Sequence, residues 1–300
     1  MHRLQHILAA TDLSAPARHA VARAFRVAVE TGARLELMHV TSQSAMDNLR
    51  QLLGMEAAPV EARILERTRA ALAQLAADLG QLHGVGADIY PAVGNVLSAI
   101  TDHADARDSG LLVVGAHGEG YLGRLLLGTT AERLLRRSLR PLLLVRQMAH
   151  EPYRRVLVPV DFSPWSLSAL ELAQAVAPQA ELVLLHAFEA PFESKLEFAG
   201  VDERIVSQYR TMARQDALNR LQGLLETARL DPDAVRLSVR HGDAPRVILT
   251  EESELDCDLI ILGKHGQGAM EELLLGSVTK HVLSEAACDV LVASVPRTAQ

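Results

Sequence analysis

Two glycine-rich segments contain the residues of this chain that are best suited to bind an anion. Both segments follow one spacing, with three glycines and a hydroxyl: Gly115, Gly118, Gly128 and Thr129 in the first, and Gly263, Gly266, Gly276 and Ser277 in the second. Glycine permits positive φ, and it lets backbone N–H groups approach an anion with no Cβ in the way. The third glycine precedes an amphipathic stretch, Thr129 to Arg137 or Ser277 to Glu285. The free N–H groups and dipole of such a helix suit phosphate oxygens, so the pattern predicts two phosphate sites.

The two segments belong to an internal duplication of the whole chain. Three further stretches recur at displacements of 149, 147 and 148 residues: Ile7–Ser14 as Val156–Ser163, Leu35–Val40 as Leu182–Ala187, and Leu111–Gly118 as Leu259–Gly266. Such a nearly constant displacement indicates a repeat of one domain, and 300 residues are comfortable for two domains of about 150. We therefore expect domains at residues 1–148 and 153–300, joined near Met148 to Tyr153.

Short apolar runs alternate with longer amphipathic stretches within each copy. In the first copy the runs lie near residues 4–10, 34–40, 87–92, 110–115 and 141–146. Runs without polar alternation are typical of parallel strands that are covered on both faces. Helices should fill the gaps, one starting at Ser14 with Pro16 in its first turn, and others over 60–80 and 201–229. The fold class predicted is α/β, with two doubly wound, five-stranded parallel sheets of Rossmann-like type in tandem.

In a doubly wound sheet the ligand lies beyond the carboxyl ends of the strands, where the strand order reverses. The first expected strand of each copy ends at an aspartate, Asp12 or Asp161, and the fourth ends at the first glycine of the segment, Gly115 or Gly263. Each aspartate could bind the ligand or could cap the helix that follows. We expect ligand contact, with a capping role left open.

The pattern G-x2-G-x9-G-[S/T], paired with an aspartate that ends the first strand, resembles the ATP-binding branch of the universal stress protein family. The resemblance covers nearly the whole chain, twice, and it implies a fold like that of the adenine nucleotide alpha hydrolases. It also implies an adenine nucleotide, ATP with or without Mg²⁺, held by two equivalent sets of residues. The sets are Ala10, Thr11, Asp12, Val40, Val114, Gly115, His117, Gly118, Gly128, Thr129 and Thr130, and then Pro159, Val160, Asp161, Ala187, Leu262, Gly263, His265, Gly266, Gly276, Ser277 and Val278. The second set is the more typical, because Pro159 and Val278 stand where the first has Ala10 and Thr130.

The resemblance leaves three functions open. We expect regulatory ATP binding in a stress response, read out by an unidentified protein partner. The alternatives are a slow ATP hydrolase and an interaction scaffold with vestigial sites. Catalytic residues are not assigned, because the nearby acids, Glu119, Glu271 and Glu272, have no matching partner between the copies. Pairing of the two copies inside the chain through their last strands is also implied, and a homodimer of chains is compatible with it.

Bulk properties exclude several other classes. The chain carries a formal charge of −7 with no long run of Lys or Arg, which argues against nucleic acid as a partner. No apolar stretch approaches the roughly 20 residues that span a bilayer, and no signal peptide is evident, so we expect a cytoplasmic protein without membrane contact. Cys257 and Cys288 are expected to be buried thiols instead of a disulfide or a metal site.

Other motifs have simpler interpretations. Residues 118–123 spell G-x-G-x-x-G, but they follow the fourth strand instead of the first, and the second copy breaks the pattern at Glu271. No P-loop motif is present in the sequence. His117 and His265 could supply acid–base chemistry, although lining of the loop is expected, and His39 and His186 are expected to be structural. Asp102, His103, Asp105 and Asp108 are expected to form a solvated helix face and not a metal site.

Overall fold

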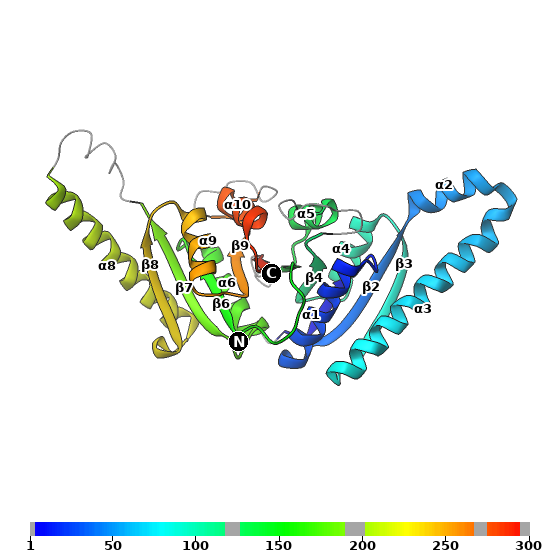
Figure 1. Cartoon of the computed structure of the whole chain (residues 1–300), viewed down its shortest axis with the longest axis horizontal. Helices are drawn as coiled ribbons and strands as arrows, with labels where there is room; N and C mark the ends of the chain where they lie inside the picture. The colour runs from blue at the N-terminus through cyan, green and yellow to red at the C-terminus, as the bar shows by residue number, and fades with distance from the viewer. Residues whose placement is uncertain (1–3, 118–126, 190–201, 267–274, 295–300) are drawn as a thin grey trace. The chain divides into compact units, whose positions relative to one another are not determined.

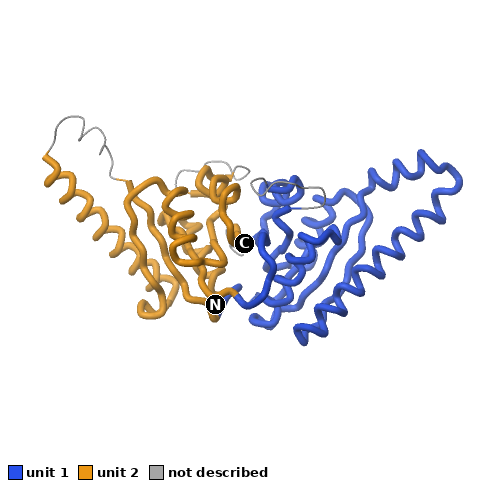
Figure 2. Tube along the Cα trace, in the orientation of Figure 1, with its two compact units in different colours: residues 1–152, 175–178 blue, residues 153–174, 179–300 orange. Residues whose placement is uncertain are grey.

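The protein is described by a computed structural model, which covers residues 4–117, 127–189, 202–266 and 275–294. The chain divides into two compact units (Figure 2): unit 1 comprises Met1–Pro152 with Ala175–Pro178, and unit 2 comprises Tyr153–Gln174 with Gln179–Gln300. Each unit contains one parallel sheet with helices packed on it (Figure 1). The α/β fold class is therefore as predicted from the repeat.

Unit 1 contains five strands. They are β1 (His6–Ala10), β2 (Arg34–Ser42), β3 (Ala87–Gly94), β4 (Leu111–Gly115) and β5 (Leu142–Val145). Its helices are α1 (Ala15–Thr31), α2 (Gln43–Leu53), η1 (Gly54–Glu56, a 3₁₀ turn), α3 (Ala57–His83), α4 (Val96–Ala106) and α5 (Thr129–Arg137). All five expected strands are present within two residues of their predicted bounds. The signal is clearest for β4 and β5, which are continuous Leu and Val runs.

Unit 2 repeats this order. Its strands are β6 (Arg155–Pro159), β7 (Glu181–Phe188), β8 (Val235–His241), β9 (Leu259–Gly263) and β10 (Asp289–Ala293). Its described helices are α6 (Pro164–Val176), α8 (Glu203–Ala228), η2 (Pro232–Ala234, a 3₁₀ turn), α9 (Ala244–Glu254) and α10 (Ser277–Glu285). The predicted helices over 201–229 and Ser277 to Glu285 are confirmed.

The strand order determines where a ligand can bind. In unit 1 the order is β3-β2-β1-β4-β5 and in unit 2 it is β8-β7-β6-β9-β10, with parallel pairing inside each unit. Right-handed crossovers place α1 and α3 on one face of the first sheet and α4 and α5 on the other. In agreement, α1 contacts α3 and α4 contacts α5. The order therefore reverses between β1 and β4, and between β6 and β9.

Local sequence signals account for the first helix of unit 1. Ser14 is the N-cap of α1, and its hydroxyl accepts a hydrogen bond from the N–H of Ala17 (3.4 Å). Pro16 lies in the first turn, where a backbone N–H would have no acceptor within the helix, so the proline costs no hydrogen bond. The helix ends at Gly32, whose φ of 69° is the left-handed conformation that favours glycine. The start at Ser14 that the sequence predicts is confirmed.

Helix α2 is the element that the sequence analysis missed. Met46, Leu49, Leu52 and Leu53 follow a helical spacing in it, although Met46 is its one buried residue. The helix extends the chain at the end of β2 before α3 returns along the sheet (Figure 1). As a result, Ser42 and Gln43 lie at the carboxyl edge of the sheet of unit 1.

A buried carboxylate, Glu36 of β2, joins two histidines in unit 1. Its Oε2 lies 2.9 Å from Nε2 of His103 and 3.5 Å from Nε2 of His6, and Arg107 lies 3.6 Å from Oε1. The His6 Nδ1 contacts the hydroxyl of Ser109 (2.9 Å). His103 was expected on a solvated helix face, and this expectation is wrong: its partner Glu36 lies 67 residues away in sequence, beyond the reach of a local pattern.

The two cysteines are buried in unit 2, as expected. Burial raises the pKa of Cys257 to about 12 and raises that of Cys288 well above its ordinary range. A thiol is reactive as its thiolate, so both side chains behave as small apolar groups at neutral pH. A search of the described helices finds none that combines the length and the apolar character needed to cross a membrane.

The histidine cluster predicts a pH-dependent stability. Burial, opposed by Glu36 and assisted by Arg34, Arg107 and His103, lowers the pKa of His6 below its usual 6.5. Below about pH 6.5 the unfolded chain therefore takes up a proton that the folded chain resists, and the free energy of unfolding should fall as the pH falls.

Urea denaturation of the protein between pH 7.5 and 5.5 measures this effect. His6→Asn keeps a group that can bond to Ser109 but does not titrate, so its stability should fall less steeply with decreasing pH. Identical slopes for the variant and the wild-type protein would show that His6 does not contribute.

Candidate functional site

A backbone hydrogen bond closes each glycine segment at the reversal point of the sheet. In unit 1 the N–H of Gly128 donates to the carbonyl of Ala116 (2.8 Å), and in unit 2 the N–H of Gly276 donates to the carbonyl of Lys264 (3.2 Å). The third glycine of each segment therefore lies next to the end of the strand that the first glycine terminates. The first and third glycines of each predicted set are thus neighbours. Gly118 of the first set lies outside the described residues.

The third glycine of each segment is also the N-cap of a helix. Gly128 caps α5 and Gly276 caps α10, both with extended backbone and without a side-chain hydrogen bond to the first turn. The first N–H groups of these helices thus receive no side-chain cap, and the following Thr129 and Ser277 are exposed. This is the arrangement that binds phosphate at helix N-termini.

The predicted aspartates lie at the ends of the first strands. Asp12 Oδ1 accepts a hydrogen bond from the N–H of Ser14 (3.0 Å), and Asp161 Oδ1 accepts one from Ser163 in the same way (3.0 Å). Each aspartate therefore stabilises the turn into the next helix, which is the structural role that the sequence left open. The second oxygen of Asp161 faces the glycine segment, because a Cβ on Gly266 would lie 2.8 Å from it.

One hydrogen-bond partner of Asp161 has no equivalent in unit 1. In unit 2 the hydroxyl of the buried Ser166 donates to Asp161 Oδ1 (3.0 Å) and accepts from the Asp161 N–H (3.2 Å). The equivalent position in unit 1 is Ala17, which has no hydroxyl. The sequence analysis missed Ser166, although a comparison of the two copies at this position would have found it.

Two histidines anchor the strand ends next to the aspartates. Nδ1 of His39 bonds to the carbonyl of Thr11 (2.9 Å), and Nδ1 of His186 bonds to the carbonyl of Val160 (2.8 Å). A carbonyl only accepts, so Nδ1 carries the proton in both rings. Burial lowers the pKa of His186, which favours its neutral form. Both rings have the structural role expected of them, and they fix the backbone of Thr11 and Val160 in the predicted sets.

The remaining predicted residues lie along the same carboxyl edges. Ala10, Val114 and Leu262 are buried, whereas Val40, Ala187 and Pro159 are partly exposed. His117 and His265 follow the first glycines, and the buried His265 packs on Trp165 with ring centroids 4.9 Å apart. Thr130 and Val278 occupy the first turns of α5 and α10. Thr130 is the one member of either set that also lines the pocket described next.

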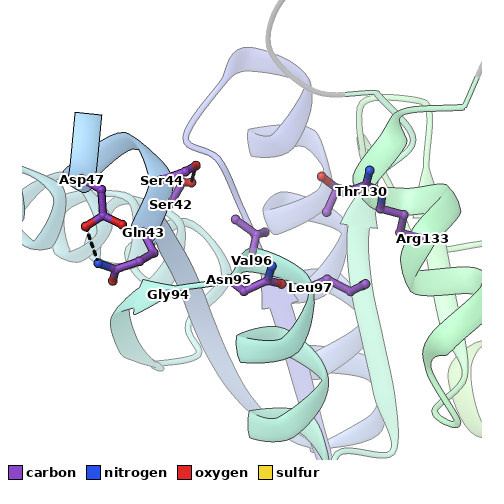
Figure 3. A pocket seen from close by; sticks show the side chains of 10 residues that line it. All are labelled: Ser42, Gln43, Ser44, Asp47, Gly94, Asn95, Val96, Leu97, Thr130 and Arg133. Atoms are coloured by element: carbon purple, nitrogen blue, oxygen red, sulfur yellow. Dashed lines mark hydrogen bonds between the residues drawn. The ribbon is translucent and has the colours of Figure 1, made fainter. Parts of the chain in front are cut away.

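A pocket of about 620 Å³ opens at the carboxyl edge of unit 1, and the sequence analysis missed most of its walls. Figure 3 shows residues from the end of β2 and the start of α2, from the β3–α4 junction and from α5 around it. The lining residues are Ser42, Gln43, Ser44, Asp47, Gly94, Asn95, Val96, Leu97, Thr130 and Arg133. Because it shares Thr130 with the predicted set, the pocket adjoins the glycine segment.

The fold is a doubly wound α/β architecture present in duplicate, and the comparisons with known proteins assign the chain to a family. The universal stress protein family profile matches residues 3–146 and 152–294. The chain therefore belongs to the universal stress protein family, with two such domains in tandem.

Individual relatives agree with this assignment. A universal stress protein of Mycolicibacterium smegmatis is 31% identical over 300 residues, covering 95% of this chain and 96% of its own. One from Mycobacterium bovis is 29% identical over 226 residues, covering 72% of this chain and 65% of its own length. The crystal structure of a universal stress protein from Archaeoglobus fulgidus matches with a TM-score of 0.62 at 20% identity, over 97% of this chain and 98% of the other, which indicates a shared fold.

The close approach of strand β9 to helix α6 predicts that Gly263 cannot be enlarged without loss of stability. A Cβ there would lie 2.6 Å from Trp165 Cβ and 3.1 Å from the His265 carbonyl oxygen. Gly263→Ala should lower the free energy of unfolding by about 1–3 kcal/mol, measured by urea denaturation.

Gly94→Ala is the matched control for this substitution. No atom lies within 4 Å of a Cβ at Gly94, so the variant should be as stable as the wild-type protein. Equal stability of both variants would show that the contact at Gly263 imposes no constraint.

Proposed function

We propose that this chain binds ATP in both units and uses it as a regulatory ligand. The observation that supports the proposal is the hydrogen bond that closes each glycine segment. It places the first turn of α5 or α10, which has no side-chain cap, next to the end of the strand where the first glycine lies. In this arrangement the triphosphate would lie against the N–H groups of α5 or α10. The adenine would lie between the aspartate and the end of the second strand, at Asp12 and Val40 or at Asp161 and Ala187.

A regulatory role agrees better with these residues than rapid hydrolysis does. Fast phosphoryl transfer requires a carboxylate that holds a metal ion and a group that positions the attacking water. Glu119, Glu271 and Glu272 are the acids of the glycine segments, and none of them has an acid at the equivalent position of the other copy. In the proposal, Mg²⁺ accompanies the phosphates of ATP, and the readout is a protein partner that distinguishes the nucleotide-bound chain from the free chain.

Titration calorimetry of the purified protein with ATP, AMP and NAD tests the proposal. We expect ATP to bind at two sites per chain and more tightly than either competitor. Preference for NAD, or no nucleotide binding at all, would contradict the proposal, and the second result would favour an interaction scaffold.

Single-turnover assays with Mg²⁺ separate regulatory binding from hydrolysis. The double variant Gly128→Val/Gly276→Val is the matched control, because a branched side chain at each helix N-cap should block the phosphates. Phosphate release by the wild-type protein that disappears in the double variant would identify a hydrolase. We expect no such difference.

The hydroxyl of Ser166, which has no counterpart in unit 1, predicts that the two ATP sites differ in how the aspartate is oriented. Ser166→Ala removes the hydrogen bonds that orient Asp161, so ATP affinity at one of the two sites should fall by about threefold to tenfold. The measurement is calorimetry, with denaturation to confirm folding.

Ser163→Ala serves as the control. Within the described part of the chain the Ser163 hydroxyl has no hydrogen-bond partner, and Asp161 receives its bond from the Ser163 backbone. Equal losses of affinity in the two variants would argue that Ser166 has no orienting role.

A further inference from the structure

The pocket of unit 1 extends the nucleotide site beyond the expected position of the triphosphate. Thr130 belongs both to the predicted phosphate set and to the pocket wall, so the two spaces meet at the first turn of α5. In Figure 3, Thr130 and Arg133 lie at one end, Asn95 and Leu97 lie in the middle, and the α2 residues lie at the other end. A ligand that follows the phosphates past Thr130 would thus enter the pocket.

The end of the pocket near the phosphates is positively charged. Arg133 is three residues after Thr130, so both side chains lie on one face of α5. The structure records no ion pair for Arg133 with any described residue, which leaves its guanidinium available to a phosphate. The acid at the far end, Asp47, is paired with Arg50 (3.1 Å) and accepts a hydrogen bond from Gln43 (2.9 Å), so it opposes an anion weakly.

Unit 2 lacks these features at the equivalent positions, which lie 148 residues later. Asn95, Thr130 and Arg133 are replaced there by Asp243, Val278 and His281. Each replacement makes its position less favourable for an anion. Asp243 adds a carboxylate, Val278 lacks the hydroxyl of threonine, and His281 lacks the permanent positive charge of arginine. In addition, His281 lies 3.3 Å from Glu285. The sequence difference between the copies thus supports an anion-binding role for the pocket of unit 1 independently of its shape.

The size of the pocket indicates more than one additional phosphate. Its volume of about 620 Å³ is in the range of sites that bind small molecules, and it is open to solvent on one side. Its far end presents the hydroxyls of Ser42 and Ser44, which lie 2.8 Å apart, and the side chain of Gln43. The aliphatic side chains of Val96 and Leu97 line the space between. Polar groups at the end of a partly apolar pocket suit a sugar and a base.

We propose that unit 1 binds a dinucleoside polyphosphate, with one nucleoside at Asp12, the phosphates along Thr130 and Arg133, and the second nucleoside between Asn95 and Ser42. The inference rests on the proposed function, because the first nucleoside occupies the ATP site. In unit 2 the carboxylate of Asp243 stands where Asn95 adjoins the last phosphate and the second nucleoside, and its charge repels that phosphate, so unit 2 binds ATP alone. The two copies of one fold thereby recognise two lengths of ligand.

The test is titration calorimetry of the full chain with diadenosine tetraphosphate, ATP and tripolyphosphate. For the wild-type protein we expect diadenosine tetraphosphate to bind one site per chain about tenfold more tightly than ATP. Tripolyphosphate should bind more weakly than both nucleotides, because it lacks the nucleosides.

Asn95→Asp is the decisive variant. Asn95 caps α4 by accepting a hydrogen bond from the N–H of Ser98 (3.1 Å), and aspartate caps equally well, so the fold is retained while a negative charge enters the pocket. The preference for diadenosine tetraphosphate should be lost, whereas ATP affinity changes by about twofold or less. Asp243→Asn, the matched control in unit 2, should leave the tight site of unit 1 unchanged.

A second variant tests size instead of charge. No atom lies within 4 Å of a Cβ at Gly94, so Gly94→Leu can place its side chain in the pocket and should abolish the same preference.

The outcomes separate the two proposals. Absence of ATP binding by the wild-type protein would refute the proposed function itself. Normal ATP binding without tighter binding of diadenosine tetraphosphate, or equal losses for both ligands in Asn95→Asp, would refute the inference alone. Tripolyphosphate that binds as tightly as diadenosine tetraphosphate would show that no second nucleoside is recognised.

Discussion

The hydrogen bond that closes the glycine segment is the interaction on which the site depends. It returns the chain from the fourth strand to the same edge of the sheet and starts α5 or α10 there, with glycine in place of a side-chain cap. A serine or aspartate at the N-cap would stabilise the helix but would occupy the N–H groups that an anion needs. The glycine N-caps of α5 and α10 thus cost a small amount of helix stability and leave the first N–H groups without a side-chain acceptor.

Most of the fold could be predicted from the sequence, because strands such as β1 and β4 are continuous apolar runs and Ser14 is a clear cap. The glycines and aspartates of the site were found for the same reason, since they end those strands. The features that were missed depend on contacts between distant segments. The partner of His103 on α4 is Glu36 on β2, and the pocket is formed by three separate segments of the chain. Helix α2 was missed although Met46, Leu49, Leu52 and Leu53 follow a helical spacing, so its sequence signal was present and was not used.

Duplication made the differences between the copies informative. Both copies keep the histidine that anchors the first strand end, His39 or His186, because that bond holds the backbone of any such site. Both copies also keep the aspartate and the hydroxyl of the glycine segment, whereas supporting side chains have diverged, as Ala17 and Ser166 show. This pattern is compatible with the different ligands that we propose for the two units.

The burial of both cysteines in unit 2 has a practical consequence. Unit 1 contains no cysteine, and the two thiols of unit 2 are protonated and shielded from solvent in the folded protein. A maleimide or disulfide reagent can therefore modify the chain only when unit 2 opens. The natural sequence thus contains a chemical reporter for one half of a tandem protein, with which the opening of that half can be followed without an introduced label.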